Sequence, residues 1–253
     1  MCSIVILFRP GHDWPVLIGA NRDEMQDRPW RAPGRHWADR PEAVAGIDLL
    51  AGGSWLGINA QGVVAAVSNR MNTLGPAEGF RSRGELVLEA LDHPDAAAAS
   101  AALADIAPNA YRPFNMVIAD NADTWWLRNL GPEEGSGMVE VKPLPPGVSM
   151  ITAHDRNDRT SPRIRRFLPL FEAASPPDPE HGEWSSWARL LASRDHGAEE
   201  GPGAAMSIET ASGFGTVSSA LIALPSPSLP PRKPVFLFAA GRPGEAPYEP
   251  VAL

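Results

Sequence analysis

The opening run of the chain is apolar at nearly every position, and this feature constrains the fold most. It extends from Cys2 to Phe8. A strand with one solvated face alternates polar and apolar residues, whereas a strand covered on both faces has no such alternation. The run therefore predicts a strand buried between two layers. A second apolar run at 15–20 follows the polar break at 9–13, and the two runs are expected to pair as a hairpin.

The remaining elements are expected in alternating groups of strands and helices. Further strands are predicted at 55–59, 63–69, 114–119, 124–128, 138–141, 148–152, 216–224 and 234–240. Helices are predicted after the capping box at 82–85, at 94–107, after Ser161-Pro162 and along the stripe of Trp184, Trp187, Leu190 and Leu191. Two sheets with helices grouped on their outer faces account for this order, so we expect a single α+β domain over residues 1–253.

The composition argues against several classes of function. The formal net charge of -8 speaks against a nucleic acid or an anionic membrane surface as the partner. No stretch approaches the ~20 apolar residues of a membrane helix. Metal and nucleotide enzymes are not expected, because there is no CxxC, HxxxH or GxGxxG motif. The glycines of Gly52-Gly53-Ser54 open a strand, where close backbone approach is favoured over phosphate binding.

The chain has one cysteine, which forbids an internal disulfide. The apolar stretch at its start is too short for a secretory signal and has no basic residues before it. We therefore expect a cytoplasmic protein that handles a small molecule. The sequence leaves its oligomeric state open.

Cys2 can act as a complete catalytic unit if Met1 is removed. It then carries a thiol and a free α-amine, whose ordinary pKa values are ~8.5 and ~7.7 to 8.0. The amine can take the proton of the thiol at neutral pH, so that no histidine is needed. The alternative is a small buried hydrophobe, which is the usual environment of a free cysteine.

A polar tetrad, Asn21-Arg22-Asp23-Glu24, follows the second apolar run. Side chains alternate between the two faces of a strand, so Asn21 and Asp23 share one face and are expected to meet Cys2. A carboxylate there would orient the terminal ammonium, and an asparagine amide could stabilise the negative charge on an attacked carbonyl. The alternative is a solvated turn in which Arg22 pairs with an acid.

The chain resembles the NRDE family, also called the transport and Golgi organisation protein 2 family. The matching motifs are Met1-Cys2-Ser3-Ile4-Val5, Ala20-Asn21-Arg22-Asp23-Glu24, Gly53-Ser54-Trp55-Leu56-Gly57-Ile58-Asn59 with Gly62, Asn69-Arg70, Ser82-Arg83-Gly84-Glu85-Leu86, Phe114-Asn115, and Phe214-Gly215-Thr216 with Ser218-Ser219. This resemblance implies the N-terminal nucleophile hydrolase superfamily, whose fold is a four-layer αββα sandwich.

Similarity to the cysteine amide hydrolases of that superfamily implies roles for individual residues. Cys2 would be the nucleophile, Asp23 would lie beside its amine, and Asn69 would stabilise the oxyanion. Those hydrolases have Arg-Asn-x-Asp where this chain has Ala-Asn-Arg-Asp at 20–23, so the arginine stands on the opposite strand face. A second departure is Val217, where much of the family has arginine.

The first functional hypothesis is an amidohydrolase that cleaves a non-peptide C–N bond of a small molecule through a thioester on Cys2. It needs no cofactor. Asp23, Asn21 and Asn69 would orient the amine and the oxyanion. Arg22, Glu24 and Arg70 are the candidates for substrate binding, the arginines through a substrate carboxylate.

The second hypothesis, also implied by the family resemblance, is a protein without turnover that binds and traffics haem, or an acyl-CoA or lipid. His154 is the candidate axial ligand to haem iron, with Cys2 as another. Arginines such as Arg22 would then pair with the haem propionates. A solvated loop residue is the alternative interpretation of this histidine.

Overall fold

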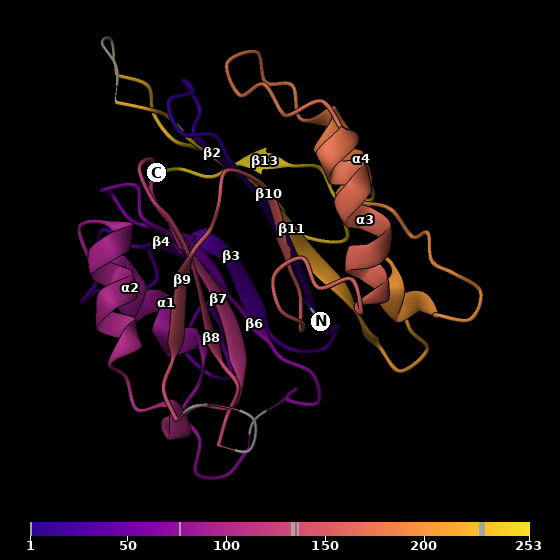
Figure 1. Ribbon diagram of the computed structural model, residues 1–253, viewed down its shortest axis with the longest axis horizontal. Coiled ribbons are helices and arrows are strands. Elements are labelled where there is room, and N and C mark those ends of the chain that lie inside the picture. Colours follow the sequence, from indigo (N-terminus) through magenta and orange to yellow (C-terminus); the bar gives the residue numbers. More distant parts are fainter. Residues whose placement is uncertain (1, 76, 133–134, 136, 228–230) are drawn as a thin grey trace. The chain divides into compact units, whose positions relative to one another are not determined.

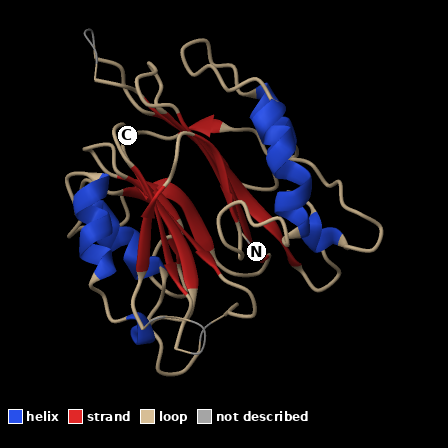
Figure 2. Cartoon of the chain, in the orientation of Figure 1, coloured by secondary structure: helices blue, strands red, loops and turns tan. Residues whose placement is uncertain are grey.

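The computed structural model describes residues 2–75, 77–132, 135, 137–227 and 231–253, and the chain divides into two compact units. The first unit contains residues 1–28 and 146–252, and the second contains residues 29–145. Each unit has one antiparallel sheet with two α-helices against one face, as Figures 1 and 2 show. None of the helices in the described part of the chain is long and apolar enough to cross a membrane.

The first unit has a six-stranded sheet in the order β10-β1-β2-β11-β12-β13. Its elements are β1 (Ser3–Phe8), β2 (Val16–Met25), β10 (Gly147–Ile151), α3 (Pro162–Ala173), α4 (Ser185–Leu191), the short 3₁₀ helix η2 (Pro202–Ala204), β11 (Phe214–Leu224), β12 (Val235–Ala239) and β13 (Glu249–Pro250). All residues of β1 are buried, and β1 pairs with β2 from Ser3–Asn21 to Phe8–Val16. The predicted hairpin and its doubly buried first strand are confirmed.

One face of this sheet packs against α3 and α4. Val5 and Leu17 share a buried cluster with Phe167 and Trp187, so the odd-numbered residues of β1 and β2 face the helices. The predicted stripe of Trp184, Trp187 and Leu191 therefore packs in the hydrophobic core. Helix α3 begins as predicted, with the Ser161 hydroxyl accepting the Ile164 N–H at 3.4 Å, and it continues past the internal Pro169 to Ala173.

The second unit has a seven-stranded sheet in the order β3-β4-β5-β6-β7-β8-β9. Its elements are β3 (Trp30–Gly34), β4 (Val44–Asp48), β5 (Leu56–Ile58), β6 (Val64–Asn69), α1 (Gly84–Leu91), α2 (Ala96–Ala104), the short 3₁₀ helix η1 (Pro108–Ala110), β7 (Phe114–Ala119), β8 (Thr124–Asn129) and β9 (Glu140–Pro143). The sequence did not predict β3 and β4. The expected capping box is also wrong, because α1 has Arg83 at its N-cap and the Glu85 carboxylate binds Arg81 instead.

Gly53 lies against the backbone at the start of α1. A Cβ atom at this position would be 2.5 Å from the carbonyl carbon of Gly84, and the Ser54 N–H donates to the Gly84 oxygen at 3.0 Å. Real Cβ contacts are never this short, so the backbones must separate if a side chain is added. The glycine thus serves close backbone approach, as its sequence context predicted.

Replacing Gly53 by alanine is expected to lower the free energy of unfolding by about 1–3 kcal/mol, because the new methyl group overpacks a backbone contact. Gly203→Ala is the matched control, since a Cβ there meets no atom within 4 Å. Its effect should stay within about 0.5 kcal/mol. Urea denaturation of both variants measures the difference, and equal stabilities would contradict the close approach.

Candidate active site around Cys2

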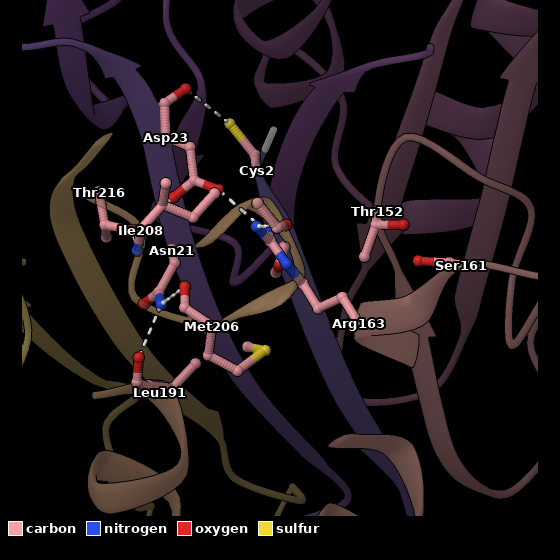
Figure 3. A network of polar contacts seen from close by, with 12 residues as sticks. Cys2, Asn21, Asp23, Thr152, Ser161, Arg163, Leu191, Met206, Ile208 and Thr216 are labelled. Atoms are coloured by element: carbon pink, nitrogen blue, oxygen red, sulfur yellow. Dashed lines mark hydrogen bonds and ion pairs between the residues drawn. The ribbon is translucent and has the colours of Figure 1, made fainter. Parts of the chain in front are cut away.

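Cys2 lies directly before β1, at the end of the hairpin where β2 carries the polar tetrad. Its thiol donates to the backbone oxygen of Asp23 across a distance of 3.8 Å (Figure 3). Burial raises the pKa of the Cys2 thiol, and the nearby Asp23 carboxylate raises it further, while the charge of Arg22 acts weakly in the opposite direction. The thiol is therefore protonated at neutral pH and requires a base to become a nucleophile.

The hairpin register decides which side chains share a face with Cys2. Ser3 pairs with Asn21, and both face the helices. Carried one residue further, the alternation places Cys2 opposite Arg22 on the other face. The expectation that Asn21 meets Cys2 is therefore wrong, because Ser3 lies opposite Asn21, whereas Asp23 does contact Cys2, through its backbone oxygen.

The Asp23 carboxylate is fixed by two side chains from distant parts of the first unit (Figure 3). Arg163 Nη1 donates to Asp23 Oδ2 at 3.0 Å and to Ser3 Oγ at 2.6 Å. Thr216 Oγ1 donates to Asp23 Oδ1 at 2.6 Å and accepts the Ile208 N–H at 2.8 Å. The side chains of Asp23 and Arg163 are 0% and 3% exposed. A buried ion pair thus fixes the end of β2, and its arginine also binds Ser3 at the start of β1.

Sequence reasoning missed Arg163, although the chain carries a signal for it. Arg163, Phe167 and Phe171 are spaced at i, i+4 and i+8, so the arginine lies on the apolar stripe of α3. It also stands in the first turn of the helix, where the macrodipole disfavours a cation. A basic residue in this position indicates a buried acidic partner.

The side chain of Asn21 makes its hydrogen bonds on the helix side of the sheet. Its Nδ2 donates to the backbone oxygens of Leu191 and Met206, each at 2.9 Å, as Figure 3 shows. Its Oδ1 accepts from Ser219 Oγ at 2.6 Å. The two amide hydrogens hold the end of α4 and the segment at Met206 against β2, so we assign Asn21 no part in the proposed chemistry.

Arg22 and Glu24 lie on the opposite face of β2. Arg22 is 5% exposed and its Nη2 is 3.9 Å from Glu24 Oε2, a carboxylate that also lies 3.6 Å from Arg28 Nε. Arg22 thus pairs with an acid, as the alternative interpretation of the polar tetrad predicted. However, Asn21, Arg22 and Asp23 belong to a buried strand and not to a solvated turn.

The other predicted site residues lie elsewhere in the two units. Asn69 ends β6 of the second unit, and the adjacent Arg70 donates through Nη1 to Asn115 Oδ1 at 2.8 Å. His154 follows β10 in the first unit, and its backbone N–H donates to Thr152 Oγ1 at 3.3 Å. The roles of Asn69, Arg70 and His154 stay predictions. Within the described residues, no group of three or more His, Cys, Asp or Glu side chains is placed to hold a metal ion.

Comparison with known proteins identifies relatives of the sequence. The family model described as "Transport and Golgi organisation 2" matches residues 1–222. A "Transport and Golgi organization protein 2 homolog" from Bos taurus is 32% identical over 131 residues, 47% of this chain and 45% of that protein. The homologue from Mus musculus is 30% identical over 127 residues, with the same two coverages. The matched region thus spans less than half the length of these relatives.

Solved structures share the fold at low sequence identity. Penicillin V acylase from Agrobacterium tumefaciens is 12% identical, with a TM-score of 0.52 over 94% of this chain and 83% of that chain. A Caenorhabditis elegans N-acylethanolamine-hydrolyzing acid amidase is 13% identical, with a TM-score of 0.55 over 88% of this chain and 92% of that chain. A conjugated bile acid hydrolase from Clostridium perfringens is also similar, at 11% identity and a TM-score of 0.52. The predicted α+β fold of the N-terminal nucleophile hydrolase type is confirmed.

Proposed function

The chain belongs to the transport and Golgi organisation 2 family, and from this premise we propose that it is an N-terminal cysteine amidohydrolase acting on a small molecule. One observation carries the proposal. The thiol of residue 2 lies at the end of a hairpin against Asp23, whose carboxylate is fixed by Arg163 and Thr216. Precise positioning of this kind is what a nucleophile and its orienting acid require. The fold shared with three amide-cleaving enzymes agrees with the assignment.

In the proposed reaction, removal of Met1, which lies outside the described residues, exposes the α-amine of Cys2. The amine takes the thiol proton, and the thiolate attacks the carbonyl carbon of a non-peptide amide. The new C–S bond forms, and the C–N bond breaks as the ammonium returns its proton to the leaving amine. Water then gives a proton to the same α-amine and attacks the thioester carbonyl. The C–S bond breaks, the acid is released, and the ammonium returns the proton to the Cys2 thiolate.

The other roles follow from this sequence of steps. Asp23 would orient the ammonium, and Asn69 would stabilise the oxyanion. Arg22, Glu24 and Arg70 are proposed to bind substrate. The thiol has to remain reduced for this chemistry, so we expect the protein to act in a reducing compartment such as the cytoplasm.

The proposal is tested by incubating the processed protein with a panel of small amides and measuring its intact mass. A substrate should add the mass of its acyl group to Cys2, and hydroxylamine should remove that mass, because it cleaves thioesters. Amine release at catalytic rates completes the test. A panel that yields neither adduct nor amine, on protein shown to lack Met1, would argue against hydrolysis.

The dependence of Cys2 alkylation on pH is expected to differ between the two forms of the protein. With Met1 in place, burial raises the pKa of the thiol, so the rate with iodoacetamide should reach half its maximum above the ordinary value of ~8.5. Removal of Met1 places an ammonium on Cys2 itself, which should lower that midpoint and speed the reaction near neutral pH. Intact mass from pH 6 to 10 reports both rates, and coincident midpoints would show that the amine does not act on the thiol.

A further inference from the structure

A β-bulge in β11 separates two polar side chains that a regular strand would place on one face. Thr216 pairs with Asp23, and Ser218 pairs with Arg22, so Val217 is the extra residue between them. Bulges re-aim neighbouring side chains and are frequent next to active sites. Here the bulge leaves Thr216 on the helix side with Asp23 and turns Ser218 to the opposite side with Arg22.

The Ser218 hydroxyl is buried without a partner. Ser218 is 1% exposed, and its Oγ has no hydrogen-bond partner among the residues that the structure describes. The adjacent Ser219 differs, since its Oγ bonds to Asn21 Oδ1 at 2.6 Å and to Tyr248 Oη at 2.7 Å. An unsatisfied buried hydroxyl costs about 1–3 kcal/mol, and this one lies beside Arg22, on a strand next to the one that carries Asp23. A hydrogen bond to a bound ligand would remove this cost.

The register places Ser218 in one row with the nucleophile. Arg22 of β2 pairs with Ser218 of β11, and both face away from the helices, while Cys2 directly precedes β1, the neighbour of β2 on its other side. Neighbouring strands lie ~4.8 Å apart, so Ser218 is roughly 10 Å from Cys2, with Arg22 between them. An oxyanion donor must lie about 3 Å from the attacked carbonyl oxygen, which excludes Ser218 from that role. This distance instead suits a second group on the substrate.

We propose that Arg22 and Ser218 bind an anionic group of the substrate, and that the site takes amides with a carboxylate or comparable anion roughly 5–10 Å from the scissile carbonyl. The guanidinium would attract such a group by its charge while it keeps its ion pair with Glu24, and the Ser218 hydroxyl offers a hydrogen-bond donor. Burial and the Asp23 carboxylate raise the pKa of the Cys2 thiol and the charge of Arg22 lowers it to a smaller extent, in agreement with this placement. This inference rests on the proposed role of Cys2.

The test compares two acylating esters that differ only in charge. They are the mono-4-nitrophenyl ester of terephthalic acid, whose carboxylate cannot reach its own ester carbonyl, and the 4-nitrophenyl ester of 4-carbamoylbenzoic acid, which has a neutral amide of similar shape in place of the carboxylate. Intact mass gives the rate of Cys2 acylation by each. The wild-type chain should react about 10-fold faster with the charged ester, which corresponds to 1.4 kcal/mol. Ser218→Ala should lose most of this preference while keeping its rate with the neutral ester. The substitution removes an unsatisfied hydroxyl, so the fold should be retained.

Ser100→Ala is the matched control. Ser100 lies in α2 of the second unit and is also buried with an unpartnered hydroxyl, and its replacement should leave the preference unchanged. Equal rates with both esters in the wild-type chain, or an unchanged preference in Ser218→Ala, would overturn the anion subsite. If neither ester labels Cys2, the proposed hydrolase function fails instead. Calorimetry with glutaric acid monoamide and the Cys2→Ala chain then decides the subsite: binding weakened by Ser218→Ala supports it, and absence of binding overturns it.

Discussion

A Cys2→Ala chain is expected to form no acyl adduct and to turn over an amide substrate roughly 10⁴-fold more slowly than the wild-type chain, because the attacking atom is absent. The fold should be retained, since the contact of the thiol with the Asp23 backbone oxygen is long, at 3.8 Å, and weak. The same unfolding midpoint in urea would show that the loss is chemical. The measurements are amine release and intact mass, made with the substrate found in the panel described above.

Cys2→Ser separates the nucleophile from the rest of the site. It keeps an oxygen in place of sulfur, but a hydroxyl gives up its proton much less readily than a thiol, so turnover should fall while substrate still binds. A KM close to that of the wild-type chain with a much lower kcat is the expected result. Unchanged turnover in both variants would mean that another side chain performs the attack.

Arg163→Ala is expected to lower the free energy of unfolding by about 3–5 kcal/mol, because it leaves the Asp23 carboxylate buried without its ionic partner. Arg166→Ala on the same helix is the matched control. The Arg166 side chain is 37% exposed, and its Nη2 lies 3.4 Å from Glu200 Oε2. Such exposed ion pairs contribute about 0–1 kcal/mol to the free energy of unfolding. Urea denaturation of the two variants should therefore differ by several kcal/mol.

A double variant tests whether the loss comes from the unpaired charge. Asp23→Asn combined with Arg163→Met removes both charges, so its stability should exceed that expected from adding the two single effects. Additive losses in the double variant, or equal small losses in Arg163→Ala and Arg166→Ala, would contradict a buried ion pair.

Local patterns in the sequence were sufficient to predict most of the helices and strands of the first unit. The hairpin of β1 and β2 follows from two apolar runs, and α3 follows from its serine cap and N-terminal proline. The strands β3 and β4 were not predictable in this way. β3 (Trp30–Gly34) is a partly exposed edge strand with a proline and a glycine, so it carries no alternating pattern. β4 contains Gly46, which makes room for Trp55, and such a contact is invisible before the fold is known.

The candidate site was predictable only in part, for a related reason. Cys2 and Asp23 could be found because they lie on one hairpin. Arg163 is 140 positions from Asp23 in the sequence, and no short pattern specifies which acid it meets. Asn21 was wrongly placed beside Cys2 because a shift of one residue in register exchanges the two faces of a strand, and Ser3 is its partner. The bulge at Val217 changes faces again, and it is visible only in the pairing of β11 with β2.

The first unit is discontinuous in the chain, and this sets an order of events during synthesis. β1 lies between β10 and β2, and the Asp23 carboxylate binds Arg163 and Thr216. β10, Arg163 and Thr216 leave the ribosome long after the amino terminus. Until these later segments emerge, β1 has β2 alone as a neighbour and the Asp23 carboxylate has neither of these partners. The buried ion pair can therefore form only after Arg163 has been synthesised, so the end of the first hairpin is fixed late in folding.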